Sequence, residues 1–291
     1  MKKIKLLDNL VVSPICYGPG IINFQPGLFN MRSSFQWREL TKYYKQKKTL
    51  KYFLKQKNTF IDTSSAYGYA ENAIGELLKS YGKKEAIICT KLSAKDQIQN
   101  GKRIRNMFNN SLMSLGKIDI YLMHWPVPKN YIDVWKQMEE LYFEKKVKCI
   151  GICNCNLHHL EELLKNCSVK PMIHQMEIHP LFTQRDITQF CKKEEIQIMA
   201  YTPLARNDDR LRNSKILKRI ANRKNKTIAQ IILRWHIQEG NIPVVNTNNI
   251  KHLSENYDIF NFCLSQEEMD MITGMNINSR LRYDADNCDF I

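Results

Sequence analysis

Short runs of apolar, often β-branched residues recur along the chain, and longer stretches with helical spacing separate them. Eight such runs occur, at 12–17, 59–62, 86–91, 118–124, 148–152, 172–176, 196–201 and 242–245. Their apolar character is almost continuous, as it is in strands that are buried on both faces of a parallel sheet. Eight parallel strands are the number that a closed barrel requires.

Segments with amphipathic helical spacing lie between these runs, at 36–57, 71–79, 131–143, 157–166, 184–193 and 228–237. Strands that alternate with helices over this length predict an α/β protein of the (β/α)8 TIM barrel type, with residues 1–291 as a single domain. A doubly wound open sheet remains as the alternative. It usually places Gly-x-Gly-x-x-Gly before its first helix, whereas Gly18-Pro19-Gly20 leads into Ile21 and Ile22. Irregular structure is expected at 20–34, 206–214 and 276–291.

Composition excludes several classes of protein. Hydrophobic residues make up 43% of the 291 residues and aromatic residues 10%, which is enough for a large core and excludes global disorder. No apolar run reaches the length of a membrane span, and the basic start lacks the apolar region of a signal peptide. The nine cysteines include no Cys-x-x-Cys pair, so reduced thiols and no metal site are expected. These features predict a cytoplasmic protein without a membrane partner.

The chain is strongly basic, with 44 Lys and Arg against 29 Asp and Glu, a formal net charge of +15. Such a charge is typical of proteins that bind nucleic acids, acidic membrane surfaces or phosphorylated ligands. The codon bias of an AT-rich genome produces the same Lys-, Asn- and Ile-rich composition. Because the basic residues are dispersed and no RNA-binding motif is present, no specific nucleic-acid partner is expected.

Polar and ionisable residues gather where the predicted strands end. In a parallel barrel the carboxyl ends of the strands line the active site. Tyr67 lies in the loop that follows the second predicted strand. The residues at or just beyond the strand ends are Asp62, Lys91, His124, Asn154, Gln175, Glu177 and Tyr201. A single polar residue of this kind often only terminates a strand, but the whole set on one rim predicts a catalytic site.

Several motifs at these positions occur in a fixed order. They are Asp62-Thr63-Ser64-Ser65-Ala66-Tyr67-Gly68 with Glu71 and Gly75, then Thr90-Lys91-Leu92, His124-Trp125-Pro126, Gly151-Ile152-Cys153-Asn154, Gln175-Met176-Glu177-Ile178-His179-Pro180 and Tyr201-Thr202-Pro203-Leu204. Over nearly its whole length the chain resembles the aldo-keto reductase family. The final Asp284-Ala285-Asp286-Asn287-Cys288-Asp289-Phe290 is similar to the short ending of bacterial and protozoal members.

The resemblance implies a catalytic set of four residues. Tyr67 is expected to be the general acid that protonates the carbonyl oxygen of the substrate. A free tyrosine has a pKa of about 10, and Lys91 is expected to lower that pKa by favouring the phenolate. Asp62 is expected to hold Lys91, and His124 to orient the carbonyl by a hydrogen bond.

The resemblance also implies NADPH (NADP) as cofactor, bound without a Rossmann fold. Asn154 and Gln175 are expected to bind the carboxamide of the nicotinamide and Tyr201 to stack on its ring. Trp125 and the segment after Gly20 are expected to shape the substrate pocket. The remaining cofactor contacts are expected from Thr202, Leu204, Thr247, Asn248, Lys251, His252 and Asn256.

The chain departs from the family pattern at several of these positions. Cys153 stands where serine is usual, and a thiol is a weaker hydrogen-bond donor. Gly18-Pro19-Gly20 replaces a Gly-Thr-Trp sequence, so an aromatic wall residue is missing. Asn246 and His252 replace the lysine and arginine that usually bind the 2′-phosphate. A preference for NADPH by less than the usual margin is therefore expected, with Lys251 still available.

Two functions follow from this interpretation. The first is an NADP-dependent oxidoreductase that reduces small aldehydes or ketones to alcohols by hydride transfer, acting as a monomer on a small-molecule carbonyl substrate. The alternative is a catalytically weak nucleotide-sensing partner of the same fold, as the family's potassium-channel β subunits illustrate. Loss of NADPH absorbance that depends on an aldehyde distinguishes the two.

Overall fold

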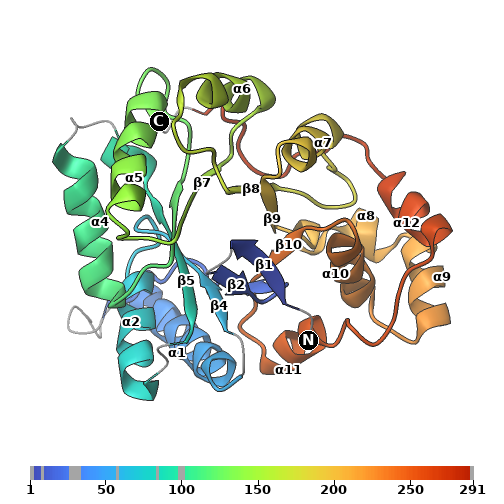
Figure 1. Ribbon diagram of the computed structural model, residues 1–291. Helices are drawn as coiled ribbons and strands as arrows, with labels where there is room; N and C mark the ends of the chain where they lie inside the picture. Colours follow the sequence, from blue (N-terminus) through green and yellow to red (C-terminus); the bar gives the residue numbers. More distant parts are fainter. Residues whose placement is uncertain are drawn as a thin grey trace.

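The structure, a computed structural model, describes residues 3–7, 10–25, 34–56, 59–82, 85–97 and 102–288. Eight strands form a closed barrel in the order β10-β3-β4-β5-β6-β7-β8-β9, and every neighbouring pair is parallel (Figure 1). The barrel prediction is confirmed, and the open-sheet alternative is wrong. The strands are β3 (Cys16–Tyr17), β4 (Phe60–Asp62), β5 (Ile87–Leu92), β6 (Ile120–Met123), β7 (Cys149–Cys153), β8 (Ile173–Glu177), β9 (Gln197–Tyr201) and β10 (Ile242–Val245).

The first predicted strand, 12–17, is divided in the structure. Its start belongs to β2 (Leu10–Val12), which pairs antiparallel with β1 (Ile4–Leu7), and only β3 enters the barrel. The chain bends between them at Pro14, whose ring fixes φ and removes a backbone donor. Leu10 and Val12 are each 1% exposed and pack against residues inside the barrel. The hairpin therefore closes the barrel at the amino-terminal ends of its strands (Figure 1).

Helices form an outer layer around the barrel (Figure 1). They are α1 (Ser34–Leu54), α2 (Ala70–Tyr81), α3 (Ala94–Gln97), α4 (Lys102–Leu115), α5 (Tyr131–Phe143), α6 (Leu157–Asn166), α7 (Arg185–Lys193), α8 (Asp209–Arg212), α9 (Lys215–Lys224), α10 (Ile228–Gln238), α11 (Ile250–Tyr257) and α12 (Gln266–Thr273), with a short 3-10 helix at Ala205–Asn207. The predicted helices are all present. Within the described residues, no helix combines the length and the apolar character needed to cross a membrane.

The predictions missed α3, α4, α9, α11 and α12, and α8 interrupts the segment 206–214 that was expected to be irregular. In α4, Ile104, Phe108 and Leu115 are buried at helical spacing, but asparagines and serines, which favour helices only weakly, surround them. Packing against α2 and β5 decides that this segment is helical.

The apolar core has two layers. Small and medium side chains, including Cys16, Cys89, Cys149 and Cys153, fill the inside of the barrel, and the larger layer lies between the strands and the helices. All nine cysteines are free, which confirms the expectation of reduced thiols. Burial raises the pKa of the Cys153 thiol, so this sulfur is an unreactive packing group at neutral pH.

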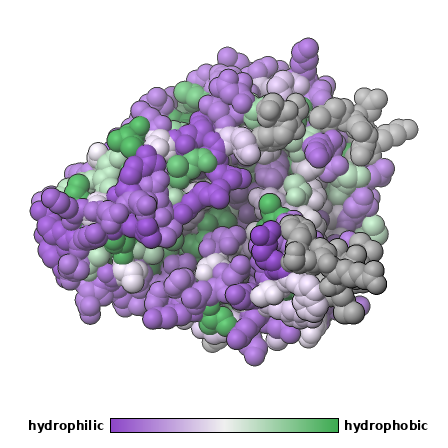
Figure 2. All heavy atoms as spheres, turned by 180° about the vertical axis from the view of Figure 1, so that it is seen from behind, coloured by the Kyte–Doolittle hydropathy of each residue, from purple (hydrophilic) through white to green (hydrophobic). Residues whose placement is uncertain are grey.

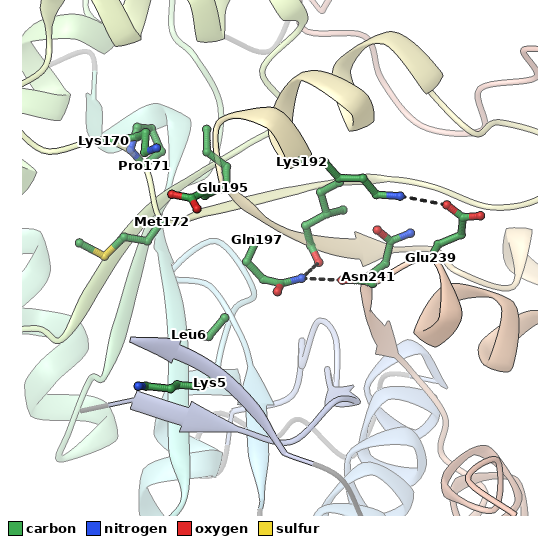
Figure 3. A pocket seen from close by; sticks show the side chains of 13 residues that line it. Lys5, Leu6, Lys170, Pro171, Met172, Lys192, Glu195, Gln197, Glu239 and Asn241 are labelled. Atoms are coloured by element: carbon green, nitrogen blue, oxygen red, sulfur yellow. Dashed lines mark hydrogen bonds and ion pairs between the residues drawn. The ribbon is translucent and has the colours of Figure 1, made fainter. Parts of the chain in front are cut away.

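A cavity of about 430 Å³ lies at the closed end of the barrel, between the β1–β2 hairpin and the amino-terminal ends of β8 and β9 (Figure 3). Three of its charged side chains are engaged with neighbouring groups. Lys192 Nζ lies 3.1 Å from a carboxylate oxygen of Glu239, and Lys170 donates to the carbonyl oxygen of Glu194. The polar residues singled out in the sequence lie at the opposite end.

Candidate active site

The carboxyl ends of the barrel strands bring the predicted catalytic residues to one rim. Asp62 is the last residue of β4, Lys91 the last but one of β5, and His124 follows β6 directly. Asn154 follows β7, and Tyr201 ends β9. The face opposite the β1–β2 hairpin is hollowed near its centre (Figure 2). The parallel register thus gathers residues that are up to 139 positions apart, from Asp62 to Tyr201, around one opening.

Lys91 and Asp62 form a buried ion pair at the base of this opening. Lys91 Nζ lies 2.6 Å from each carboxylate oxygen of Asp62 and 2.8 Å from the carbonyl oxygen of Thr63. The lysine is 1% exposed and the aspartate 4%. Burial alone would lower the pKa of Lys91, but the charges of Asp62 and Tyr67 raise it above its ordinary value. The ammonium group therefore remains charged at every pH at which the protein works.

Tyr67 lies next to this ion pair, with its ring centroid 5.5 Å from Lys91 Nζ. Its loop is held by the segment after β3: Ile22 N donates to the carbonyl oxygen of Tyr67 at 3.1 Å, and Tyr69 N donates to that of Ile22 at 2.8 Å. Gly68 has φ of 63°, and a Cβ atom there would lie 2.4 Å from Ile22 O. Only glycine fits this close crossing, so Gly68 fixes where Tyr67 stands.

The structure corrects the expected pKa of Tyr67. Burial raises this pKa, and the opposing effect of the Lys91 charge, which does lower it, is smaller. The net shift is upward, whereas the sequence analysis expected a lower value. Tyr67 consequently carries its proton at neutral pH, which is the state that a general acid needs at the start of a reaction.

His124 is neutral, and its tautomer follows from its neighbour. Burial, and then the charge of Lys91, lowers the pKa of His124 to about 3. Its Nδ1 lies 3.1 Å from Ser64 Oγ, which itself accepts a hydrogen bond from Ala66 N at 3.2 Å. Among the described residues no other acceptor for the buried Ser64 hydroxyl proton is recorded, so this hydroxyl donates to Nδ1. The ring proton then lies on Nε2, which becomes the donor.

Three further rim residues form a polar group suited to an amide ligand. Asn154 has φ of 60°, donates from Nδ2 to His124 O at 2.9 Å, and accepts the Tyr201 hydroxyl at 2.7 Å. Gln175 donates to Asp62 Oδ1 at 2.9 Å. No hydrogen bond to Gln175 Oε1 is recorded within the described chain. One acceptor oxygen and a flat aromatic ring thus lie beside the catalytic set, which fits the carboxamide and ring of a nicotinamide.

The loop after β9 contains strained backbone. Thr202 has φ of 52°, which is rare for a β-branched residue, and Ala205, Arg206 and Asn207 follow with φ between 47° and 63°. The carbonyl oxygen of Pro203 accepts a hydrogen bond from the buried His236. Strain of this kind is concentrated at functional sites. Thr202 and Leu204, both predicted cofactor contacts, are half-buried in this loop.

The residues predicted to bind the far end of the cofactor follow β10. Thr247 accepts at its carbonyl oxygen from Tyr17 at 3.1 Å. The side chain of Lys251 is 82% exposed and lies 3.9 Å from Glu255. Asn248 and His252 are exposed, whereas Asn256 is 5% exposed.

Asn246 packs against the segment after β3. A Cβ atom on Gly20 would lie 2.5 Å from Asn246 Nδ2.

Trp125 is 8% exposed and packs with Ala94, Val127 and Ala285. It therefore lies between the loops after β5 and β6 and the carboxyl-terminal tail. Of the segment 20–34, which was also expected to shape the pocket, residues 26–33 lie outside the described residues.

His158, His159 and Asp286 place three side-chain ligand atoms within 4.8 Å of one another, although the sequence predicted no metal site. His159 Nδ1 accepts from Asn156 N at 3.2 Å, so its Nε2 carries the proton and faces Asp286 Oδ1 at 3.5 Å. A metal ion would need that nitrogen deprotonated. The cluster is best described as a contact between α6 and the tail.

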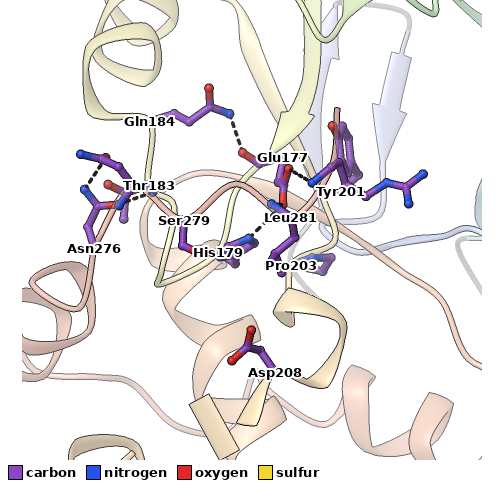
Figure 4. A network of polar contacts seen from close by, with 12 residues as sticks. Glu177, His179, Thr183, Gln184, Tyr201, Pro203, Asp208, Asn276, Ser279 and Leu281 are labelled. Atoms are coloured by element: carbon purple, nitrogen blue, oxygen red, sulfur yellow. Dashed lines mark hydrogen bonds and ion pairs between the residues drawn. The ribbon is translucent and has the colours of Figure 1, made fainter. Parts of the chain in front are cut away.

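Sequence reasoning missed two contributions to this site. Ser64 lies in the Asp62–Gly68 motif, where the family pattern has alanine, and its contact with His124 was not predicted. Glu177 was placed on the rim without a partner. Its carboxylate accepts backbone hydrogen bonds from Leu281 and Arg282, which lie more than a hundred positions away (Figure 4). A contact with an irregular tail leaves no periodic signal in a sequence.

Comparison with known proteins identifies reductases of similar sequence. The chain is 37% identical over 230 residues to the 9,11-endoperoxide prostaglandin H2 reductase of Trypanosoma cruzi, covering 78% of this chain and 81% of that protein. It is 38% identical over 234 residues to the glyoxal reductase of Bacillus subtilis, covering 79% and 83%.

Solved structures agree with these relatives. The aldo-keto reductase MGS-M4 from a Medee basin deep-sea metagenome library has a TM-score of 0.86 at 30% identity, covering 98% of this chain and 99% of that one. A mutant of Gox0644 in complex with NADPH has a TM-score of 0.84 at 27% identity, covering 99% of both chains. The family model "Aldo/keto reductase family" matches residues 31–277, and this chain belongs to that family.

Proposed function

We propose that the protein reduces small aldehydes or ketones to alcohols with NADPH, with Tyr67 as the general acid. The observation that carries this proposal is the buried Lys91–Asp62 ion pair next to the phenol of Tyr67, with neutral His124 beside it. The names of its relatives, glyoxal reductase and methylglyoxal reductase, indicate small dicarbonyl compounds as the first substrates to test.

The four residues divide the work of the proton transfer. The reduced nicotinamide, when bound, supplies the hydride. Tyr67 donates its phenolic proton to the carbonyl oxygen, and the fixed charge of Lys91, 5.5 Å from the ring centroid, stabilises the phenolate that remains. Asp62 accepts hydrogen bonds from the Lys91 ammonium group and so keeps it at this position. His124 donates from Nε2 to the carbonyl oxygen and so orients it toward Tyr67.

The cofactor fits the residues that are present. Gln175 Oε1 and the second N–H of the Asn154 amide are available to a carboxamide, and the ring of Tyr201 provides a stacking surface. The backbone of the strained loop after Thr202 is a candidate for the pyrophosphate. Complexes of structural relatives with NADPH support this choice of cofactor.

The direct test is an assay of the purified chain with NADPH and a panel of methylglyoxal, glyoxal and aromatic aldehydes. Loss of NADPH absorbance that depends on the aldehyde is the expected result. Tight NADPH binding without any turnover across the panel would contradict the proposal and favour the nucleotide-sensing alternative.

Ser64→Ala is expected to lower kcat about threefold to tenfold, because one hydrogen bond that fixes the His124 tautomer is lost. The binding of NADPH should not change, since Ser64 is not among the residues proposed to contact the cofactor. Steady-state kinetics together with a fluorescence titration of NADPH measure both quantities. Ser65→Ala is a matched control, because the Ser65 hydroxyl donates to a backbone oxygen of Lys91 and not to His124.

NADPH is expected to give a higher kcat/KM than NADH, by a small margin. Asn246 stands where the family has lysine and lies against Gly20, so Lys251 is the nearby cation with an exposed side chain. Lys251→Ala should therefore narrow the ratio of the two kcat/KM values. The alignment of this loop is wrong if NADH is preferred, or if the ratio is unchanged in Lys251→Ala.

A further inference from the structure

The carboxyl-terminal tail crosses the rim of the barrel and is fixed there by a buried carboxylate. Leu281 N donates to Glu177 Oε1 at 2.9 Å, and Arg282 N donates to Glu177 Oε2 at 3.0 Å (Figure 4). Glu177 is 1% exposed and ends β8, and its register partner in β9 is Tyr201. The backbone of Arg282 is therefore held next to the rim, one strand away from Tyr201.

A second set of contacts holds the tail just beyond this point. Asn156, the residue before α6, donates from Nδ2 to Asp284 Oδ1 at 2.8 Å and to Asp286 Oδ2 at 2.6 Å. Ala285 is buried in the cluster that includes Trp125. Arg282 thus lies on a short stretch of chain between two anchors, one after β7 and one at the end of β8. The stretch has little freedom to move away from the opening.

The side chain of Arg282 is exposed and lacks an anionic partner. Its recorded side-chain contact is with the ring of Tyr283, whose centroid is 5.6 Å from the guanidinium carbon. No carboxylate lies within ion-pair distance of it among the described residues. Arg280, two positions earlier, differs in this respect, because it lies 3.6 Å from Asp284. An arginine that is held by its backbone but left unpaired is available to a ligand.

The positive charge of Arg282 acts on the pKa values of Tyr67 and Tyr201. Burial raises the pKa of Tyr67 and of Tyr201, and among the smaller effects the positive charge of Arg282 lowers both. The backbone of Arg282, held by Glu177 one strand away from Tyr201, puts this residue at the side of the opening where Tyr201 lies. A group attached to a carbonyl that contacts Tyr67 is then within reach of Arg282.

We propose that Arg282 binds an oxyanion carried by the carbonyl substrate, so that aldehydes or ketones bearing a carboxylate or phosphate are preferred over their neutral counterparts. This inference rests on the proposed function. A guanidinium group binds either oxyanion through two parallel hydrogen bonds, which gives geometry as well as charge. The net charge of +15 favours the approach of such substrates.

The test compares matched substrates in the whole enzyme with NADPH. 4-Carboxybenzaldehyde is paired with its neutral methyl ester, and glyceraldehyde 3-phosphate with glyceraldehyde, so that carboxylate and phosphate are distinguished. Arg282→Ala is expected to lower the acid-to-ester ratio of kcat/KM about tenfold, and Arg282→Lys to lower it less. Arg219→Ala on α9 removes one exposed arginine charge elsewhere, and it should leave the ratio unchanged.

Three results separate this inference from the proposed function. If Arg282→Ala leaves both ratios unchanged while the neutral substrates are reduced, the inference is wrong and the proposed function stands. If Arg282→Ala weakens NADPH binding and lowers kcat/KM for charged and neutral substrates alike, Arg282 serves the cofactor and the inference is again wrong. If the wild-type enzyme reduces methylglyoxal but no member of either pair, the inference is wrong and the proposed function stands.

Discussion

Tyr67→Phe is expected to lower the turnover of an aldehyde by about 10² to 10⁴-fold, which is the usual contribution of a positioned general acid. The phenol is protonated at neutral pH because burial raises its pKa, and Lys91 is ready to stabilise the phenolate. Phenylalanine keeps the ring and loses only the hydroxyl. The dissociation constant of NADPH should therefore change little, so that the loss appears in kcat.

The measurement is a single-turnover reduction followed by NADPH absorbance, because product release then does not mask the chemical step. Tyr69→Phe is the matched control. Its hydroxyl is bound to Glu76, at the outer side of the same loop, and its loss should leave the rate unchanged. An unchanged single-turnover rate in Tyr67→Phe would show that another group supplies the proton.

Much of the site could be predicted from the sequence because the barrel converts strand ends into neighbours. Asp62, Lys91 and His124 are far apart along the chain, yet each ends or follows an apolar run of strand length. Parallel strands carry their carboxyl ends to one rim, so a residue's place at the end of a run is enough to bring it to the opening. No knowledge of side-chain contacts is needed for that step.

The protonation states of Tyr67 and His124 could not be predicted from the sequence and follow only from the structure. The sign of the shift at Tyr67 depends on two opposing quantities, the depth of burial and the distance to Lys91, and sequence spacing gives neither. The His124 tautomer depends on a hydroxyl of Ser64 that is 60 positions away. The tail was also beyond pattern reasoning, since its contact with Glu177 uses backbone amides, which every sequence possesses. Pattern reasoning likewise joined β2 to β3, because the apolar run continues across Pro14.

The stability of the protein is expected to fall as the pH decreases below about 6.5, because buried histidines remain uncharged in the folded state. His124 at the rim is one of them, and two more lie in the core. His174 and His236 are each 0% exposed, and burial lowers the pKa of each to about 3 from an ordinary value of 6.5. Each has one ring nitrogen without a recorded hydrogen-bond partner, His174 Nε2 and His236 Nδ1. The hydrogen bond from His236 to the carbonyl oxygen of Pro203 favours the charged ring, but the effect of burial is larger.

The direction follows from the proton balance. Between pH 6.5 and 3 the unfolded chain binds protons at these two positions and the folded chain does not, so protonation draws the equilibrium toward unfolding. The stabilisation is fully present above pH 6.5. Each histidine costs about 1.4 kcal/mol at pH 5.5, because one pKa unit corresponds to about 1.4 kcal/mol. Together with His124, whose pKa is lowered in the same way, they lower the free energy of unfolding by about 4 kcal/mol, roughly a thousandfold in the equilibrium constant.

Urea unfolding at pH 7.5 and pH 5.5 measures this difference above the range in which ordinary carboxylates titrate. His236→Gln removes one titrating ring. The decrease in its free energy of unfolding from pH 7.5 to pH 5.5 should therefore be smaller than that of the wild type by about 1.4 kcal/mol. His252→Gln, at an exposed side chain on α11 with no carboxylate within ion-pair distance among the described residues, is the matched control and should leave the difference between the two pH values unchanged. Equal stability of the wild type at the two pH values would mean that the buried rings accept protons in the folded state, and that the core around β8 and α10 adapts to charge.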